Sequence, residues 1–391
     1  MKILISTDTV GGVLTYTAEL AAALEVGGEE VVVATMGPWL RRAQRETLPS
    51  RVHESGFRLE WMEDPWDDVE AAGEWLLRLE EEERPDIVHL CSYAHASLPF
   101  QAPKVLVAHS DVLSWWRAIH GTEAPPSWNR YREEMTAGLE AADAVVAPTA
   151  AMLAELRCDP ALNPERTQVI HNGSPTPPPN RTSLSELHQL DPPADDQVDA
   201  VRGGTPFVLG SGRFWDAAKN LAALDSAAEG LAWPVVVAGD LGDGDLGEGS
   251  APLHARATGQ LDGAALTTLR RAAPIYAAPA VYEPFGLGIL EAARDGCALV
   301  LGDIPSLREL WEDAAIFVDP RNPDALHEVL ACLIDAPQVR EDLAAKARAR
   351  AGEYTIERTA SAYRALYATL LNDDGRPRIP GRNRLTKALQ A

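Results

Sequence analysis

The segment from Tyr282 to Gly296, with the sequence YEPFGLGILEAARDG, leaves the chain few choices of fold. It stands between two apolar runs, residues 274–280 and 297–301, of the kind that form buried parallel strands. A proline and two glycines follow its first carboxylate, which indicates a tight turn before a short helix. We therefore predict a strand, a turn and a helix in an α/β sheet, with helix-start amides that can hold an anion.

Two glutamates of this segment are spaced for a long ligand. Glu283 lies in the predicted turn, and Glu291, eight positions later, lies inside the predicted helix. Their carboxylates would accept hydrogen bonds at two depths, with the helix-start amides between them. A ligand with hydroxyls at both ends and a diphosphate in the middle, such as a nucleotide sugar, fits that spacing.

A second segment, Gly212 to Asn220 (GRFWDAAKN), places Arg213 in a loop and Lys219 at the start of the next predicted helix. The chain has 58 Asp and Glu against 35 Lys and Arg, a net charge of -23, so an anionic ligand must meet local cations. Arginine binds a diphosphate as a fork and lysine as a point charge. An ion pair between Arg213 and a neighbouring carboxylate is the alternative interpretation.

Together the two segments resemble the E-x7-E signature and the diphosphate clamp of the retaining GT-B glycosyltransferases of family 4, also called glycosyl transferases group 1. The resemblance covers nearly the whole chain. It implies an α/β fold of two Rossmann-like, doubly wound parallel-sheet domains facing across a cleft. It also implies transfer of a sugar from a nucleotide-diphosphate sugar to an acceptor with retention of anomeric configuration, without a metal or other cofactor.

The resemblance also implies roles for single residues. Arg213, Lys219 and the turn amides would stabilise the departing diphosphate, and Glu283 would hold the donor sugar. His109, at the end of a predicted strand, would steady the sugar from the first domain, although such a histidine can also be purely structural. The predicted catalytic residues are His109, Glu283, Arg213 and Lys219. The other predicted donor-binding residues are Gly11, Gly12, Leu261, Phe285, Gly286, Leu287 and Glu291, the last of which would accept from the ribose hydroxyls.

The glycine pair near the start of the chain is open to two interpretations. Gly11 and Gly12 follow the apolar run 2–7 and precede apolar residues at helical spacing, which predicts a strand, a turn and a helix. The pattern G-x-G-x-x-G is absent, so a nicotinamide site is poorly supported. The family resemblance assigns the pair to close approach of a substrate, and a tight turn that needs glycine dihedrals is the alternative.

Composition along the chain predicts its domains. Helical and strand periodicity fails after residue 174, where four prolines occur within residues 175–179. We predict an N-terminal acceptor-binding domain at 1–174, a Pro/Gly-rich linker at 175–204 and a nucleotide-sugar-binding domain at 205–354. A helix at 355–372 is expected to cross back to the first domain, and 373–391 reads as a flexible tail.

Charge and cysteine content exclude several classes of protein. The negative net charge argues against nucleic-acid binding, and four widely spaced cysteines suggest neither a zinc ribbon nor a disulfide framework. With no leader or membrane span evident, a cytoplasmic enzyme is expected. The acidic run 240–249 is interpreted as a flexible loop rather than a metal site. Three arginines within 38–48, around Arg41, predict a solvated helix face, with weak peripheral membrane contact as the alternative.

Several functional alternatives stay open at this stage. An epimerase or glycan phosphorylase could share the fold, and a non-catalytic nucleotide-sugar-binding partner is a candidate from another class. The acceptor could be a small molecule, a glycan or a lipid-linked sugar, and the sequence does not single out a base or a sugar.

Overall fold

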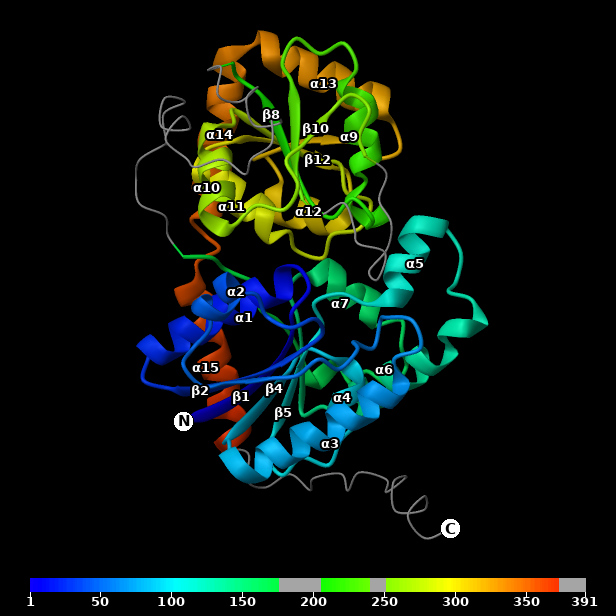
Figure 1. The fold of residues 1–391 in the computed structure, drawn as a ribbon, viewed down its shortest axis with the longest axis vertical. Coiled ribbons are helices and arrows are strands. Elements are labelled where there is room, and N and C mark those ends of the chain that lie inside the picture. The colour runs from blue at the N-terminus through cyan, green and yellow to red at the C-terminus, as the bar shows by residue number, and fades with distance from the viewer. Residues whose placement is uncertain (176–204, 240–250, 373–391) are drawn as a thin grey trace. The chain divides into compact units, whose positions relative to one another are not determined.

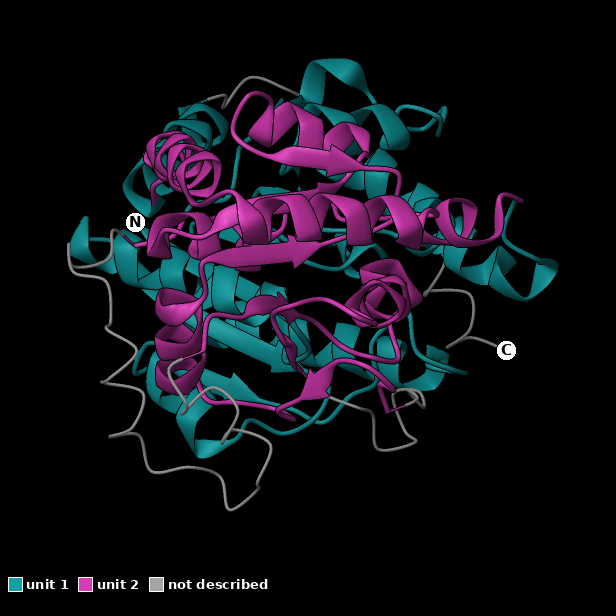
Figure 2. Cartoon of the chain, turned by 90° about the horizontal axis from the view of Figure 1, so that it is seen from above, with its two compact units in different colours: residues 1–114, 123–173, 356–391 teal, residues 115–122, 174–355 magenta. Residues whose placement is uncertain are grey.

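The computed structural model describes residues 1–175, 205–239 and 251–372 of the chain. The predicted acidic loop, the predicted tail and all of the predicted linker except Pro175 lie outside these residues. The chain divides into two compact units (Figure 2). Unit 1 comprises residues 1–114, 123–173 and 356–391, and unit 2 comprises 115–122 and 174–355.

The described part of unit 1 contains a parallel sheet of seven strands in the order β3-β2-β1-β4-β5-β6-β7 (Figure 1). The chain runs outward from β1 to β3 and then returns to β4, which pairs with the other side of β1. The sheet therefore reverses its winding between β1 and β4. The strands are β1 Lys2–Asp8, β2 Glu30–Met36, β3 Val52–Glu54, β4 Ile87–Leu90, β5 Lys104–Val107, β6 Ala144–Ala147 and β7 Thr167–Val169.

Helices alternate with strands along unit 1, because segments with apolar residues at helical spacing alternate with the apolar runs that form buried strands. The first helix begins directly after Gly11, whose φ of 78° would strain a residue with a side chain. The last helix, which the sequence predicts to cross back, belongs to unit 1 and packs against the first one. These helices are α1 Gly12–Val26, α2 Arg42–Thr47, α3 Trp66–Glu83, α4 Tyr93–Ala96, α6 Asn129–Ala141, α7 Ala150–Leu156 and α15 Ile356–Asn372, with short 3-10 turns at Pro126–Trp128 and Pro164–Arg166.

Helix α5, Val112–His120, is divided between the two units. Its residues from Trp115 onward group with unit 2. Apolar pattern alone does not reveal this, because the pattern shows that a helix face is buried and not what buries it.

The described part of unit 2 contains a second parallel sheet, of six strands in the order β10-β9-β8-β11-β12-β13. Here the chain runs outward from β8 to β10 and returns to β11 beside β8. The strands are β8 Val208–Ser211, β9 Val235–Ala238, β10 Arg256–Ala257, β11 Ile275–Ala278, β12 Ala298–Gly302 and β13 Ile316–Val318. The helices are α9 Leu221–Ala228, α10 Gly263–Ala272, α11 Leu287–Asp295, α12 Pro305–Trp311, α13 Pro323–Asp335 and α14 Pro337–Ala351.

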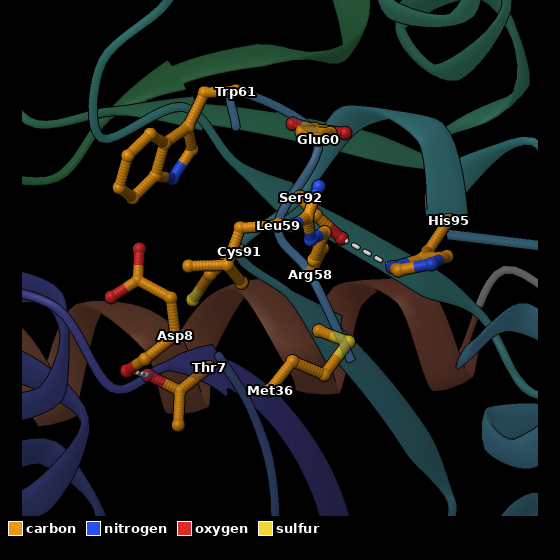
Figure 3. A pocket seen from close by; sticks show the side chains of 10 residues that line it. All are labelled: Thr7, Asp8, Met36, Arg58, Leu59, Glu60, Trp61, Cys91, Ser92 and His95. Carbon is orange, nitrogen blue, oxygen red and sulfur yellow. Dashed lines mark hydrogen bonds between the residues drawn. The ribbon is translucent and has the colours of Figure 1, made fainter. Parts of the chain in front are cut away.

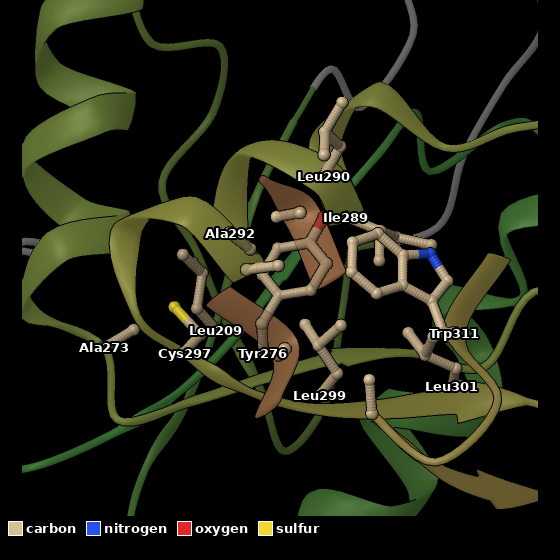
Figure 4. Packing of buried hydrophobic residues seen from close by; sticks show 14 of the residues in the cluster. Leu209, Ala273, Tyr276, Ile289, Leu290, Ala292, Cys297, Leu299, Leu301 and Trp311 are labelled. Atoms are coloured by element: carbon tan, nitrogen blue, oxygen red, sulfur yellow. The ribbon is translucent and has the colours of Figure 1, made fainter. Parts of the chain in front are cut away.

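The core of unit 2 holds α11 against the sheet (Figure 4). Ile289 and Leu290 of the helix are buried with Leu299 and Leu301 of β12. Tyr276 of β11 lies among them, and its hydroxyl is 2.6 Å from Ser211 Oγ at the end of β8. Burying such side chains contributes about 1.5–3 kcal/mol each, which fixes the register of α11 and of the turn before it.

The place of Lys219 differs from the prediction. It was expected at the start of the next helix, but it ends a separate 3-10 turn, Ala217–Lys219, and α9 starts at Leu221. Asn220 interrupts the two because it is left-handed, with φ 53°, and its Nδ2 donates to the carbonyls of Pro279 and Pro320. The fold class, two doubly wound parallel sheets of Rossmann type, is confirmed.

Candidate active site

The predicted diphosphate-binding residues gather where the sheet of unit 2 reverses its winding. Ser211 ends β8, Arg213 and Lys219 follow it, and Glu283 follows β11, the neighbouring strand. In open parallel sheets ligands bind beyond the carboxyl ends of the strands at this point of reversal, because the flanking helices leave on opposite faces there.

Lys219 and Glu283 are directly paired. Lys219 Nζ lies 2.6 Å from Glu283 Oε2, although the residues are 64 positions apart, and the two side chains are mostly buried. The backbone carbonyl of Glu283 accepts a 2.6 Å hydrogen bond from Ser306 Oγ, which fixes the turn. The pair therefore joins the loop after β8 to the loop after β11.

Arg213 is held by a carboxylate that the sequence interpretation did not single out. Its Nη2 lies 2.8 Å from Asp216 Oδ2, and its guanidinium stacks over the ring of Trp215 at 4.6 Å. Burial opposes ionisation of Asp216, but Arg213 and Lys219 outweigh it and hold its pKa below the usual value. The ion pair named as the alternative for Arg213 is thus present in the chain without ligand. Its signal was the carboxylate three positions after the arginine.

Asp216 organises the whole segment. Its Oδ1 accepts from the backbone N–H of Ala218 at 3.0 Å and from Trp115 Nε1 at 3.2 Å, and only 8% of the residue is exposed. A buried carboxylate with three kinds of donor keeps the loop between β8 and α9 in one conformation.

The turn before α11 offers amides to an anion. Gly286 is left-handed, with φ 85°, and a Cβ there would meet Ile289 Cδ1 at 2.8 Å. The amides of Leu287 and Gly288 come before the first hydrogen bonds of α11, which Ile289 and Leu290 donate to the carbonyl of Gly286, and they carry the positive end of the helix dipole. Phe285, in contrast, is 4% exposed and packs edge-on against Tyr354, so its side chain belongs to the core.

Glu291 is bound by an arginine that the sequence interpretation missed. Its Oε2 lies 2.9 Å from Nη1 of Arg270, whose Nε is 2.9 Å from Asp295. Burial raises the pKa of Glu291 even though Arg270 opposes this. Leu261, the weak candidate for contact with a base, is half-buried against the core of unit 2.

Three predicted residues lie in unit 1. His109 follows β5, and its ring meets the ring of Tyr16 edge-on, with 4.4 Å between centroids. Among the described residues, His109 Nε2 has no hydrogen-bond partner. Burial lowers the pKa of His109 to about 3, so the ring is neutral at physiological pH. Gly11 caps α1 and Gly12 begins it. The structure thus gathers the predicted residues in two groups, one within each unit.

A buried polar network lies behind His109. His89 Nδ1 is 2.6 Å from the hydroxyl of Tyr367 on α15, and His89 Nε2 is 3.3 Å from the hydroxyl of Tyr16. Burial lowers the pKa of His89 to about 3, so this ring is neutral as well. The network ties α15 to the ring that positions His109. No local sequence signal predicts it, because its members are up to 278 residues apart.

A pocket opens where the sheet of unit 1 reverses its winding, between the ends of β1 and β4 (Figure 3). The space in and around it that holds no protein atoms, open solvent included, is about 350 Å³. The described residues that line it are Thr7, Asp8, Met36, Arg58, Leu59, Glu60, Trp61, Cys91, Ser92 and His95. The strand-end residues among them were visible in the sequence, whereas Glu60 was not, since it comes from a loop without a motif.

Other predicted features can be placed as well. Arg42 pairs with Glu46 at 2.9 Å and Arg45 with Glu54 at 3.4 Å, while Trp39 is 67% exposed, so membrane contact here stays a prediction. Within the described ranges, no cluster of three His, Cys, Asp or Glu could bind a metal. No helix in the same ranges is long and apolar enough to cross a bilayer.

The chain is similar to known glycosyltransferases over most of its length. Residues 10–176 match the profile of Glycosyltransferase Family 4, and residues 198–350 match that of Glycosyl transferases group 1. The α-maltose-1-phosphate synthase of Mycolicibacterium smegmatis is 30% identical over 306 residues, which cover 70% of this chain and 76% of that protein. A phosphatidyl-myo-inositol mannosyltransferase of the same organism is 29% identical over 42% of this chain and 45% of its own.

Solved structures share the fold. Sucrose-phosphate synthase from Thermosynechococcus elongatus superposes with a TM-score of 0.75 at 19% identity, covering 95% of this chain and 99% of that one. HepE from Anabaena in complex with UDP-glucose superposes with a TM-score of 0.74 at 18% identity, covering 94% and 100%. Together with the strand orders and the two profile matches, these likenesses establish that the chain is a GT-B glycosyltransferase and belongs to glycosyltransferase family 4.

Proposed function

We propose that this glycosyltransferase moves a sugar from a nucleotide-diphosphate sugar to an acceptor hydroxyl, with retention of anomeric configuration and without a bound metal. The observation that carries the proposal is the Lys219–Glu283 pair at the point of reversal of the second sheet, with Arg213 on the same loop. Structures of HepE, which shares the fold, are complexes with UDP and UDP-glucose, and this supports a nucleotide-sugar donor.

The reaction needs stabilisation of a leaving diphosphate. The bond from the anomeric carbon to a diphosphate oxygen breaks, and the acceptor oxygen bonds to the same carbon. Arg213, Lys219 and the first amides of α11 meet the negative charge that develops on the diphosphate. Both cations are held by carboxylates in the free chain, so the ligand exchanges one set of oxygen partners for another without moving the loop far.

The proposed reaction requires neither a base nor a nucleophile from the chain. The acceptor hydroxyl passes its proton to the departing diphosphate on the face from which the bond breaks, and this same-face exchange retains the configuration. His109 is neutral above pH 3 and offers its Nε2 as a hydrogen-bonding atom to the sugar rather than as an acid. Glu283 and Glu291 accept from sugar and ribose hydroxyls, respectively.

Thermal shift tests donor binding. The full chain is heated with UDP, GDP, ADP or dTDP and with their sugars, since a ligand that binds only the folded state raises the melting temperature. One nucleotide is expected to stabilise clearly, by about 2.7 kcal/mol at a hundredfold excess over its Kd. Arg213→Ala and Lys219→Ala should each remove most of the gain. Absence of a response to every nucleotide would refute the proposal.

Two further measurements test the mechanism. Proton NMR of the product reports its anomeric configuration, and retention is expected. Turnover should persist in excess EDTA, because the proposal assigns charge stabilisation to Arg213, Lys219 and helix amides. An inverted product or complete loss in EDTA contradicts the respective part of the proposal while leaving donor binding intact.

A further inference from the structure

A cluster of four charged side chains joins the ends of α10 and α11 in unit 2. Arg270 and Arg271 lie in the last turn of α10, and Glu291 and Asp295 lie one turn apart on α11. Arg270 pairs with both carboxylates, and Arg271 pairs with Asp295 at 3.2 Å. The formal charges of the cluster cancel. The proposed function uses Glu291 to bind the ribose but gives the other three side chains no task.

The guanidinium of Arg270 is held on all three of its nitrogens. Nε lies 2.9 Å from Asp295 Oδ2, Nη1 lies 2.9 Å from Glu291 Oε2, and Nη2 donates to Thr267 Oγ1 at 3.1 Å. Thr267 gives its own hydroxyl hydrogen to the carbonyl of Gly263, so its oxygen is oriented to accept. Arg270 is also 6% exposed, so packing holds it as well. A planar fork held in this way sets the direction of each carboxylate with which it pairs.

The two carboxylates of the cluster differ in their access to solvent. The side chain of Asp295 is 5% exposed, and that of Glu291 is 22% exposed. Asp295 is buried within the cluster and has Arg271 as a second cation. Glu291 keeps accessible surface, about 6 Å along α11 from Leu287, the first residue after the turn that is proposed to bind the diphosphate. Arg270 therefore connects a buried anchor to a carboxylate that a ligand can reach.

Arg270 also favours the ionised form of Glu291. Burial raises the pKa of Glu291, and the charge of Arg270 opposes this effect. The second carboxylate, one turn further along the helix, raises the pKa again because like charges at this spacing repel. An ionised carboxylate only accepts hydrogen bonds, which suits two neighbouring ribose hydroxyls. A protonated one would turn one of its oxygens into a donor.

We propose that Arg270 is a positioning residue of the donor site: anchored by Asp295, it holds the Glu291 carboxylate in place, so that the chain selects a ribonucleotide donor over its 2′-deoxy counterpart. The assignment rests on the proposed function. A carboxylate held in one direction accepts from both ribose hydroxyls, and a donor without the 2′-hydroxyl leaves one of these hydrogen bonds unmade. Among the nucleotides of the thermal-shift panel, UDP, GDP or ADP is therefore expected to stabilise the chain, and dTDP is not.

Arg271 provides a matched comparison within the same cluster. It pairs with the same Asp295 from the same turn of α10, and its side chain is 20% exposed. Among the described residues, no ion pair joins Arg271 to Glu291. Loss of Arg271 should therefore disturb the contact between the two helices without changing the carboxylate that meets the ribose.

Calorimetric titration of the full chain tests the assignment with two matched ligands: the nucleoside diphosphate that stabilises the chain, and the 2′-deoxy form of the same nucleotide. The unaltered chain should bind the ribose form at least about tenfold more tightly, which corresponds to one hydrogen bond to a charged group. Arg270→Gln should weaken the ribose form about tenfold and the deoxy form less than about threefold, so the preference should shrink at least about threefold. Arg271→Gln should leave the preference unchanged within about twofold.

Arg270→Lys takes the place of Arg270→Gln if circular dichroism shows that the latter does not fold. Lysine keeps the positive charge of the cluster but pairs as a point charge, so it cannot hold both carboxylates as the fork does. The preference for the ribose form should then fall by about threefold, while the Kd of the deoxy form stays within about twofold of that of the unaltered chain.

The outcomes separate this assignment from the proposed function. Equal weakening of both ligands by the Arg270 variant would overturn the assignment, because a purely structural role affects both ligands alike. Equal Kd values of the two ligands in the unaltered chain, stabilisation by dTDP alone, or an Arg271→Gln effect equal to that of Arg270→Gln would also overturn it. In each of these cases a nucleotide still binds and the proposed function stands. Absence of binding by every nucleotide instead refutes the proposed function, and the assignment with it.

Discussion

The two sheets reverse their winding in the same way but place different charged side chains at the point of reversal. In unit 2 the loop after β8 brings Arg213 and Lys219 to this point, beside the amides of α11. In unit 1 the corresponding place, between β1 and β4, holds Asp8 and Glu60. Topology determines where a ligand binds in such a sheet, and the side chains after the strands determine which ligand.

The charges of the two places are also compensated differently. In unit 2, Glu283 and Asp216 each have a cation within 3 Å, and the pKa of Asp216 stays low. In unit 1, Glu60 accepts hydrogen bonds from the backbone N–H groups of Tyr93 and Ala94, and burial raises its pKa to about 7. Asp216 therefore keeps its charge, whereas Glu60 gains or loses a proton near neutral pH.

The largest effect is expected from Lys219→Ala. Loss of the point charge on the diphosphate, together with an unpaired Glu283, should lower kcat/KM for the donor by about 10²–10³. Steady-state kinetics with the stabilising nucleotide sugar measure it. Lys346→Ala, at an exposed lysine of α14, is the control and should retain full activity. A loss in kcat/KM below tenfold for Lys219→Ala would contradict the proposed role of the unit 2 cations and, with it, the comparison of the two units.

His109→Phe should reduce turnover without weakening nucleotide binding. Phenylalanine keeps the edge-on contact with Tyr16 but removes Nε2, so kcat should fall roughly 10- to 100-fold, the worth of a hydrogen bond made in the transition state. Calorimetric titration should give a nucleotide Kd within twofold of the unaltered chain. An unchanged kcat would assign His109 to packing alone.

Arg213→Lys should lower kcat/KM by about tenfold, a smaller loss than that expected for Lys219→Ala. The charge remains, but the fork that can bind two oxygens and the stacking on Trp215 are lost. Comparison with Arg213→Ala separates geometry from charge. Equal losses in the two variants would show that a point charge at this position contributes nothing, contrary to the proposed clamp.

The smallest expected effect is on the stability of the fold at acid pH, where the buried, neutral ring of His109 is costly. The pKa of His109 is about 6.5 in the unfolded chain and about 3 in the folded one, so its neutral burial destabilises the fold increasingly as pH falls below 6.5. His109→Phe removes this cost, and its melting temperature relative to the unaltered chain should rise between pH 7.5 and 5.5. The gain at pH 5.5 corresponds to about 1.4 kcal/mol, or about 3 °C for a unit of this size.

The pKa of Glu60 is raised rather than lowered, so its contribution to stability depends on pH in the opposite direction to that of His109. Its raised pKa means that the folded chain holds a proton which the unfolded chain has released, so stability is lost as pH rises from about 4.5 to about 7. A relative melting temperature of His109→Phe that falls toward pH 5.5, or stays level, would contradict the assignment of a buried neutral ring to His109.

Much of the fold could be predicted because the signals are local. Strand β1, Lys2–Asp8, lies at the apolar run 2–7, and helix α13, Pro323–Asp335, has its start marked by the residues around it. The helix starts where Asn322 caps it and Pro323 supplies the first position, which depends on residues a few places apart. The break at Asn220 was missed because its left-handed backbone is held by carbonyls of distant loops.

Of the candidate site, the residue types at the strand ends were readable from the sequence, and their partners were not. Hydrophobic periodicity, turn residues and motif spacing identified Arg213, Lys219 and Glu283, since each of these signals lies within a short stretch of sequence. Which charges pair, as with Arg270 and Glu291, and which group titrates, as with Glu60, was decided by the tertiary structure alone. The reason is that ion pairing and burial depend on neighbours brought together by strand order, and strand order is a property of the folded sheet.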